Sequence, residues 1–133
     1  MNSKYVYPAI FTKEKDGGYS ITFPDVKGCF TEGNSLPEGI YMAEDALALC
    51  IYSFYEEKHI DPPTPSDVSS IRLKKNQFVN LIACDTLAYR KKFNSKAVKK
   101  TVTIPSWLNE EALALELNFS QLLKEALLSK VNM

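Results

Sequence analysis

One short segment, residues 98–104, constrains the fold of this chain more than any other. Its sequence, Val-Lys-Lys-Thr-Val-Thr-Ile, predicts a strand that ends at Pro105, and two short helical patterns follow it. Successive side chains of a strand point to opposite sides, so one face of this strand is apolar and the other can form hydrogen bonds. The apolar face holds Val98, Val102 and Ile104, and the polar face holds Lys99, Thr101 and Thr103. One strand with two helices is too small to bury its own core, so we expect this segment to pair with a second copy.

The two helices after the strand can be placed by their caps. Proline is acceptable in a first helical turn, and apolar residues at roughly helical spacing predict a first helix over about residues 105–115. Asn118 and Gln121, three residues apart, predict a reciprocal N-cap for a second helix. The backbone N–H groups of Phe119 and Ser120 would stay free there, which suits them to bind a phosphate. Asn118, Phe119 and Ser120 are therefore the predicted phosphate contacts.

The segments Lys-Lys-Thr-Val-Thr-Ile-Pro and Asn-Phe-Ser-Gln-Leu-Leu-Lys-Glu-Ala-Leu together resemble the ribbon-helix-helix family of DNA-binding domains, over about residues 98–131. In that family two strands form a ribbon that enters the major groove. The resemblance implies that Lys99, Thr101 and Thr103 contact bases and that the start of the second helix clamps the DNA backbone. Glu116 departs from the family pattern, because a glycine commonly ends the first helix there. A left-handed residue other than glycine would cost about 1 kcal/mol more, so we expect a different helix end.

Charge gives modest support to the DNA interpretation. Residues 91–133 contain seven Lys and four Glu, a net charge of +3, whereas residues 1–90 contain nine basic and twelve acidic residues, a net charge of −3. A basic end on an otherwise acidic chain favours attraction to phosphate. The alternative is an ordinary dimerisation or packing element whose lysines are merely solvated. The full order of strand, proline, helix, asparagine and helix favours DNA binding.

Three strands are predicted near the N-terminus. Residues 5–12 are rich in aromatic and branched side chains and predict the first, with Pro8 making it an edge strand or placing a bulge there. A turn at residues 16–18 leads to a second strand over residues 19–23, in which apolar and polar side chains alternate. A third strand is predicted over about residues 29–32.

A long helix and a last strand complete the N-terminal part. Ser35 and Glu38 predict a capping box for a helix that ends near Lys58. Three prolines then forbid further helix, so residues 61–70 should be extended. An apolar strand is predicted over residues 78–85.

The chain is expected to form two domains. Residues 86–93 predict either a short helix or a linker, and residues 91–97 are polar enough to separate a domain of residues 1–90 from one of residues 98–133.

The N-terminal part resembles the HicB family, the antitoxins of HicA/HicB toxin-antitoxin pairs. The similarity lies in Tyr-Pro-Ala-Ile-Phe, Asp-Gly-Gly-Tyr-Ser-Ile-Thr-Phe-Pro-Asp and Gly-Cys-Phe-Thr-Glu-Gly ahead of an Ala-Glu-Asp-Ala-Leu helix, over about residues 5–49. It implies a partial ribonuclease-H-like domain without nuclease activity that binds the HicA toxin, a small basic ribonuclease. The expected fold class is therefore α+β, with an N-terminal partial ribonuclease-H-like β-β-β-α-β domain followed by a C-terminal ribbon-helix-helix domain.

The resemblances imply an antitoxin that neutralises a HicA-type toxin and represses its own operon by binding operator DNA. The expected toxin contacts are Tyr19, Phe23, Asp25 and Glu32, although the two aromatic residues fit a core equally well. We expect a homodimer through the C-terminal domain, and higher assembly through the N-terminal domain stays open. The alternative function is a stand-alone ribbon-helix-helix repressor whose N-terminal domain binds a ligand or builds oligomers.

A working nuclease is the other alternative, because ribonuclease-H folds cut nucleic acid with clustered carboxylates that hold metal ions. The candidates are Asp25, Glu32, Asp45 and Asp85, but their positions favour surface charges, so we expect neither an enzyme nor a metal site or cofactor. The three cysteines, Cys29, Cys50 and Cys84, show no metal or disulfide spacing and predict buried free thiols. No apolar run approaches the roughly 20 residues of a membrane-spanning helix, so a cytoplasmic protein is expected.

Overall fold

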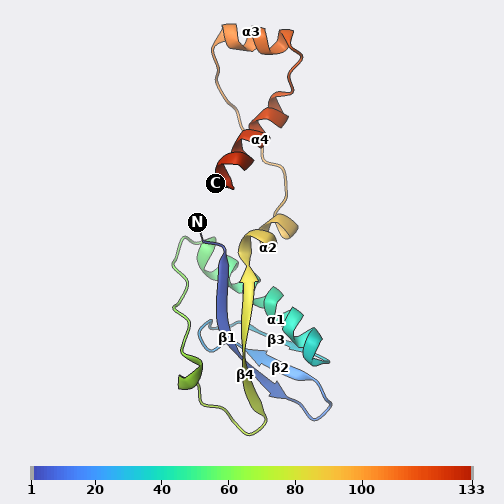
Figure 1. Ribbon diagram of the computed structural model, residues 1–133, viewed down its shortest axis with the longest axis vertical. Helices are drawn as coiled ribbons and strands as arrows, with labels where there is room; N and C mark the ends of the chain where they lie inside the picture. Colours follow the sequence, from blue (N-terminus) through green and yellow to red (C-terminus); the bar gives the residue numbers. More distant parts are fainter. Residues whose placement is uncertain (1, 133) are drawn as a thin grey trace. The chain divides into compact units, whose positions relative to one another are not determined.

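The computed structural model describes residues 2–132. The chain divides into two compact units, unit 1 (residues 1–96) and unit 2 (residues 97–133). Within the described residues it is a mixed α+β protein with a four-stranded antiparallel sheet and four α-helices, which confirms the predicted class. Figure 1 shows the sheet and its helices in unit 1, and the helices α3 and α4 of unit 2.

The sheet of unit 1 has the strand order β3-β2-β1-β4, and every neighbouring pair is antiparallel. Its strands are β1 (Lys4–Lys13), β2 (Tyr19–Thr22), β3 (Phe30–Gly33) and β4 (Gln77–Asp85). Helix α1 (Leu36–Ile51) lies between β3 and β4 in the chain, so the predicted β-β-β-α-β order is observed.

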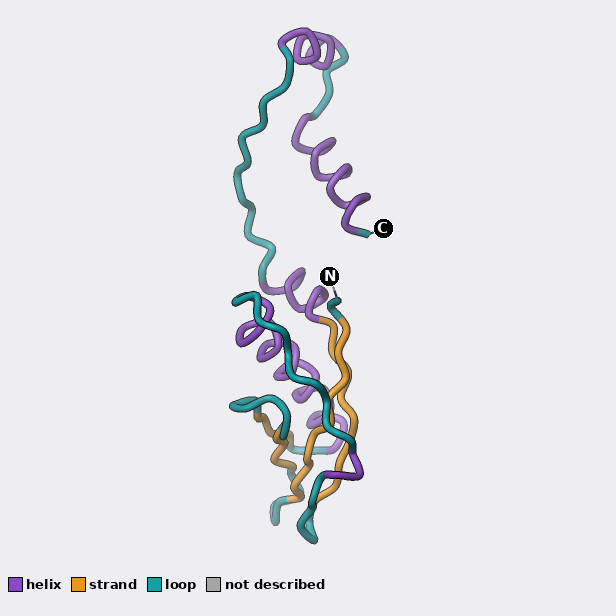
Figure 2. Tube along the Cα trace, turned by 90° about the vertical axis from the view of Figure 1, so that its left-hand side faces the viewer, coloured by secondary structure: helices purple, strands orange, loops and turns teal. Residues whose placement is uncertain are grey.

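Helix α1 covers one face of this sheet (Figure 2). Its N-cap is Ser35, whose Oγ accepts a hydrogen bond from the backbone N of Glu38 at 3.3 Å. After Ile51 the chain continues through a π-helical turn, Tyr52–Glu56. Alternate residues of the strands meet one side of the helix, as strand and helix periodicity require. The fully covered core comprises Tyr7, Ala9, Phe11, Ile21, Val26, Ala43, Leu47, Ile51 and Ile82.

Pro8 neither lies on an edge strand nor forms a bulge, so that prediction is wrong. Strand β1 is an inner strand, and its pairing with β4 runs without a break from Lys4 opposite Asp85 to Thr12 opposite Gln77. Lys13 N donates to Asn76 O at 2.9 Å. In an antiparallel pair alternate residues bond to the partner strand, so the odd-numbered residues of β1 direct their backbone groups to β4 and the even-numbered ones direct theirs away from it. By that alternation the nitrogen of Pro8 points away from β4, and β2 ends before it reaches this position. The missing N–H is therefore tolerated.

The proline-rich connection between α1 and β4 is fastened to the rest of unit 1. The Tyr7 hydroxyl donates to the carbonyl oxygen of Pro63, and Ser66 N donates to the Asp25 carboxylate at 2.9 Å. Apart from one short 3₁₀ turn, Val68–Ser70, residues 61–70 carry no helix or strand, as predicted.

Residues 86–93, for which the sequence predicts either a short helix or a linker, form helix α2 (Thr86–Phe93). The ring of Tyr89 lies 6.0 Å from that of Tyr52, so α2 packs beside the continuation of α1. The lysines of α2 therefore belong to unit 1.

Unit 2 contains α3 (Ser106–Ala114) and α4 (Phe119–Val131), close to the two predicted helices. Residues 97–105 form no strand, and within the single chain described they have no strand beside them. The predicted strand requires a second copy, so its formation stays a prediction. No helix among residues 2–132 is long and apolar enough to cross a membrane.

Helix α3 ends in the left-handed geometry that glycine favours, although the residue there is Glu116. Its φ is 55°, Leu117 N donates to Ala112 O at 3.1 Å, and Glu116 N donates to Leu113 O at 3.0 Å. These two bonds form a Schellman motif. The expectation of a different helix end is therefore wrong, because both backbone bonds are made despite the strain of the side chain.

Candidate functional site

The predicted base-contacting residues of unit 2 lie open to solvent. Lys99, Thr101 and Thr103 are exposed, and their side chains form no hydrogen bond with any other residue of the described range. The apolar residues of the same segment, Val98, Val102 and Ile104, are exposed as well. Neither face of the predicted strand is covered within one chain.

The start of α4 presents free backbone donors. Asn118 caps the helix, because its Oδ1 accepts from Gln121 N at 3.0 Å. The reciprocal half of the predicted cap is wrong: the side-chain amide of Gln121 donates to Glu125 Oε1 at 3.0 Å, one turn further on. Phe119 and Ser120 donate to no acceptor within residues 2–132. Free N–H groups at the positive end of a helix dipole favour an anion.

Unit 2 lacks a core of its own. None of its described residues is buried, and its large apolar side chains stand in water, with Trp107 66% and Leu115 71% exposed. The other exposed apolar residues of its helices include Leu108, Leu113, Leu122, Leu123, Leu127 and Leu128. Many large exposed apolar side chains in one short segment are typical of an interaction surface.

The four predicted toxin contacts of unit 1 have different environments. Phe23 is 3% exposed and belongs to the core. Tyr19 is partly buried against Phe11 and Phe78, with ring centroids 6.3 Å and 6.0 Å away. Asp25 accepts hydrogen bonds from Ser66. Of the four, only Glu32 is exposed, so an aromatic contact would need another residue.

Sequence analysis did not single out Phe30, an exposed aromatic residue on the same strand as Glu32. Its side chain is 72% exposed on edge strand β3, and it lines a shallow cavity of about 580 Å³ with Glu32 and Met42. Strand alternation was the available signal, because Phe30 and Glu32 share the face opposite the helix, while Thr31 pairs with buried Ile21.

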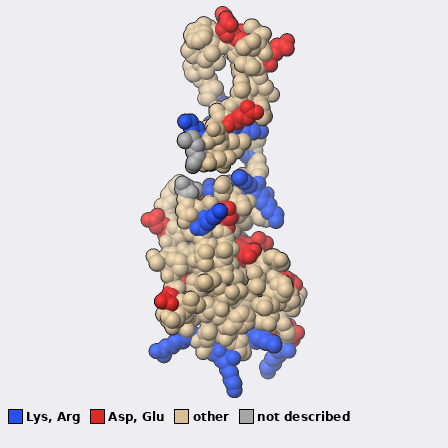
Figure 3. Space-filling view, viewed as in Figure 1, with Lys and Arg blue, Asp and Glu red and all other residues tan. Residues whose placement is uncertain are grey.

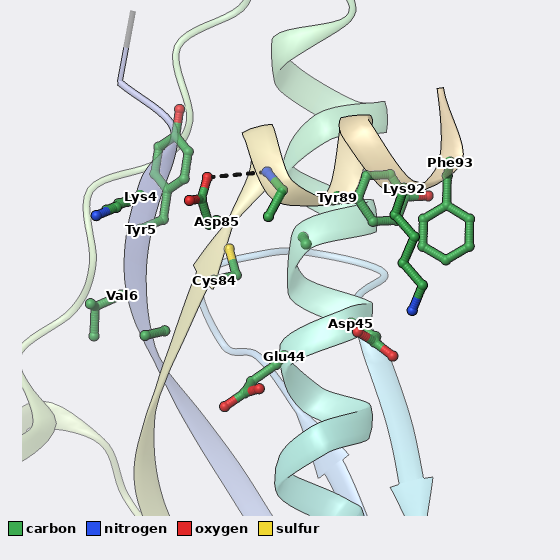
Figure 4. Close-up of a pocket in the computed structure, with 13 residues that line it drawn as sticks. Lys4, Tyr5, Val6, Glu44, Asp45, Cys84, Asp85, Tyr89, Lys92 and Phe93 are labelled. Carbon is green, nitrogen blue, oxygen red and sulfur yellow. Dashed lines mark hydrogen bonds between the residues drawn. The ribbon is translucent and has the colours of Figure 1, made fainter. Parts of the chain in front are cut away.

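The carboxylates considered for a nuclease do not gather. Among the described residues no three His, Cys, Asp or Glu side chains are placed to hold a metal ion. Asp85 is the N-cap of α2 and accepts from Leu87 N at 3.0 Å and Ala88 N at 3.4 Å (Figure 4). Although burial alone would raise its pKa, hydrogen bonds from Ser3 and these amides hold the pKa of Asp85 below its usual value. Its role is structural.

The three cysteines are free, as predicted: Cys29 and Cys50 are buried and Cys84 is half-buried. Burial raises the pKa of Cys84 to about 12, so this thiol stays protonated at neutral pH.

A second feature that the sequence did not reveal is a buried carboxylate at Glu56. Its Oε2 accepts from the Tyr5 hydroxyl at 3.0 Å and from Thr86 Oγ1 at 2.9 Å, and its Oε1 is buried without a partner among residues 2–132. Burial, together with the hydrogen bond to Glu56, raises the pKa of Tyr5 to about 12. Glu56 thus joins β1, the end of the α1 region and the start of α2.

The charge contrast predicted between the two ends of the chain does not follow the structural boundary. Lys91, Lys92 and Lys96 fall in unit 1, so residues 1–96 carry twelve basic and twelve acidic residues and residues 97–133 carry four of each. Neither unit has a net charge. Local clusters of charge must therefore carry any electrostatic argument.

Comparison with known proteins places the chain. A family model described as the HicB_like antitoxin of bacterial toxin-antitoxin system matches residues 7–122. A 64-residue stretch is 36% identical to Antitoxin HicB of Escherichia coli strain K12 and covers 48% of this chain and 46% of that protein. The chain thus spans about half the length of that curated relative.

Two solved structures share the fold at larger coverage. A chain of the toxin-antitoxin complex from Streptococcus pneumoniae has a TM-score of 0.62 at 26% identity, over 96% of this chain and 99% of that one. The crystal structure of antitoxin HicB3 has a TM-score of 0.51 at 27% identity, over 96% and 98% of the two chains. The family match begins within β1 and ends within α4, so it includes both units. The chain therefore belongs to the HicB-like antitoxins of bacterial toxin-antitoxin systems, a family of antitoxins and not of enzymes.

Proposed function

We propose that this chain binds and neutralises a small HicA-type ribonuclease toxin through unit 1, and that it represses its own operon through a ribbon-helix-helix formed by two copies of unit 2. The family match supports the antitoxin role, and the related Streptococcus pneumoniae chain comes from a toxin-antitoxin complex, which supports a toxin partner. The β-β-β-α-β order of unit 1 supports a partial ribonuclease-H-like domain.

The observation that carries the DNA-binding part is the uncovered apolar surface of unit 2. Two antiparallel copies of residues 98–104 would turn Val102 and Ile104 onto the helices of both chains and remove this surface from water. The same pairing would direct Thr101 and Thr103 outward, as a ribbon in the major groove requires. The free amides at the start of α4 then suit a phosphate.

The dimer can be tested on the full chain by light scattering at micromolar concentration. We expect at least a dimer, and Val102→Lys should reduce the molar mass relative to the wild type, because it places a charge on the apolar face through which the two copies of unit 2 would pair. Thr101→Lys is the matched control, since it adds the same charge to the opposite face of the same strand and should leave the dimer intact. A monomeric wild-type chain would exclude the ribbon.

The division of labour on DNA can be tested by titration at several salt concentrations. Thr101→Ala or Thr103→Ala should reduce discrimination between operator and random DNA by about 1–3 kcal/mol while the salt slope stays nearly constant, because lost base contacts carry sequence information. If Lys99 meets a phosphate, Lys99→Ala should weaken binding to all sequences and lower the salt slope by about one. Wild-type operator affinity in the Thr101, Thr103 double variant would show that this strand does not read the groove.

The toxin partner can be tested by co-purification of the full chain with a HicA-type toxin encoded beside its gene. The exposed Phe30 and Glu32 on β3 are the proposed contacts, so Phe30→Ala and Glu32→Lys should weaken the complex. Tyr41→Ala, also exposed but on α1, is the control for surface substitution. If no toxin binds while operator binding persists, the chain acts as a stand-alone repressor.

A further inference from the structure

The segment that joins the two units concentrates positive charge. Residues 86–109 hold six basic side chains and no acidic one, whereas the rest of the chain holds ten basic and sixteen acidic residues. The six are Arg90, Lys91, Lys92, Lys96, Lys99 and Lys100. The chain is therefore neutral only as a whole. Charge of one sign gathered in one segment attracts a polyanion more strongly than the same charge dispersed over the surface.

Two of these side chains are engaged within unit 1. Arg90 Nε donates to Thr86 O at 3.4 Å. The ammonium of Lys92 lies 5.2 Å from the ring centroid of Phe93. Lys92 also lines a cavity of about 540 Å³ (Figure 4), in which the other charged lining residues are Lys4, Glu44, Asp45 and Asp85. Both side chains thus have local partners or opposite charges nearby and need no further ligand.

Lys91 and Lys96 have no such partners. Both are exposed, and neither side chain forms a hydrogen bond or an ion pair within residues 2–132. Lys91 lies in the last turn of α2, where the helix dipole favours a cation. The dipole does not account for Lys96, because residues 94–105 form neither helix nor strand. These two lysines are therefore free to bind an anion.

The ribbon proposed for unit 2 begins a few residues after them. Six residues lead from Phe93, the end of α2, to Lys99, the first predicted base contact. An extended chain spans at most about 3.5 Å per residue, so α2 ends within roughly 21 Å of the ribbon. This distance is about six base pairs of B-DNA. Two antiparallel strands start at opposite ends of their ribbon, so the two basic segments would leave it on opposite sides.

We propose that Lys91 and Lys96 of each copy bind backbone phosphates of duplex DNA beyond the bases that the ribbon reads, one pair of lysines on each flank. This inference rests on the ribbon of two unit 2 copies proposed above. Such contacts carry no sequence information, but they fix the register of a protein on the duplex and raise its affinity. The DNA site is then longer than the ribbon by up to about six base pairs on each side.

The dependence of binding on duplex length tests this inference. The full-length chain is titrated with random-sequence DNA duplexes of about 12 and about 30 base pairs at several salt concentrations, because phosphate contacts do not depend on sequence. The double variant Lys91→Gln, Lys96→Gln removes four lysines from a dimer. Each lost phosphate contact lowers the salt slope by about 0.9, so the slope on the longer duplex should fall by about 3.6. On the shorter duplex, which ends before the flanks, it should change by less than about one.

Two further variants separate contact from net charge. Lys15→Gln, Lys75→Gln is the matched control, because it removes the same charge beyond the opposite ends of β1 and β4 from α2. Basic side chains gather at this lower end of unit 1 in Figure 3. The control should keep its salt slope within about one of the wild type. Lys91→Arg, Lys96→Arg retains both charges and should bind as the wild type does.

A fall of less than about two on the longer duplex, or an equal fall on both duplexes or in the control, would overturn the inference. Tighter lysine-dependent binding to an RNA duplex of the same length would overturn it as well and assign the segment to RNA. The double variant Thr101→Ala, Thr103→Ala separates this inference from the proposed function. If it loses operator discrimination while the lysine variant binds normally, only the flank contacts fail. If it keeps wild-type operator affinity, the ribbon fails, and the flank contacts fail with it.

Discussion

Replacing Glu116 with glycine should stabilise unit 2, because Glu116 holds a backbone conformation that its side chain disfavours. Its φ is 55°, and a left-handed conformation costs an ordinary L-residue roughly 1–2 kcal/mol. The side chain is exposed and forms no hydrogen bond within residues 2–132, so its removal breaks no contact. The greater freedom of glycine in the unfolded chain offsets about 0.4–1 kcal/mol of the gain. We expect a net increase of about 0.5–1 kcal/mol in the free energy of unfolding.

Urea unfolding followed by tryptophan fluorescence can measure this change in unit 2 alone, because the only tryptophan of the sequence, Trp107, lies in α3. Protein concentration must be held constant, since the stability of a dimer depends on it. Glu116→Ala is the matched control: it removes the same charge but keeps a Cβ atom, so its stability should stay within about 0.5 kcal/mol of the wild type.

Equal stabilisation by alanine and glycine would refute the reasoning, because the gain would then come from the lost charge and not from the backbone. Destabilisation by glycine would show that the Schellman geometry at Glu116 is not strained in the assembled protein.

Two further predictions concern unit 1. Tyr5→Phe removes the hydroxyl that donates to Glu56 at 3.0 Å and should lower the free energy of unfolding by roughly 1.5–3 kcal/mol in thermal melts followed by circular dichroism, while exposed Tyr41→Phe should change little. Burial and Glu56 raise the pKa of Tyr5 to about 12, whereas an unfolded tyrosine loses its proton near pH 10. The contribution of Tyr5 to stability is therefore full below pH 10 and is lost between pH 10 and 12. If the melting temperature of the wild type does not fall between pH 10 and 12 relative to that of Tyr5→Phe, the assignment is contradicted. Gly33→Ala would put a Cβ atom 2.5 Å from the backbone N of Gly39 in α1 and should cost about 1–3 kcal/mol in urea unfolding, and wild-type stability would show that the helix can shift freely.

Short-range patterns in the sequence determined most of the elements of this protein. Alternation across residues 19–23 marked β2, helical spacing marked α1, α3 and α4, and the caps at Ser35 and Asn118 marked two helix starts correctly. These signals are reliable because they reflect bonds and side-chain directions within a few residues of the chain. They also identified residues 98–104 as a segment whose apolar side chains stay exposed in a single chain.

Contacts between distant residues were decided only by the tertiary structure. The place of Pro8 in an inner strand depends on where β2 ends, and the burial of Phe23 depends on the packing of α1 against the sheet. Glu56 is a buried acceptor only because Tyr5 and Thr86, far from it in sequence, converge on it. The free edge of β4 likewise follows from strand order, which local periodicity does not encode, since every strand shows the same two-residue repeat whether it is central or at an edge.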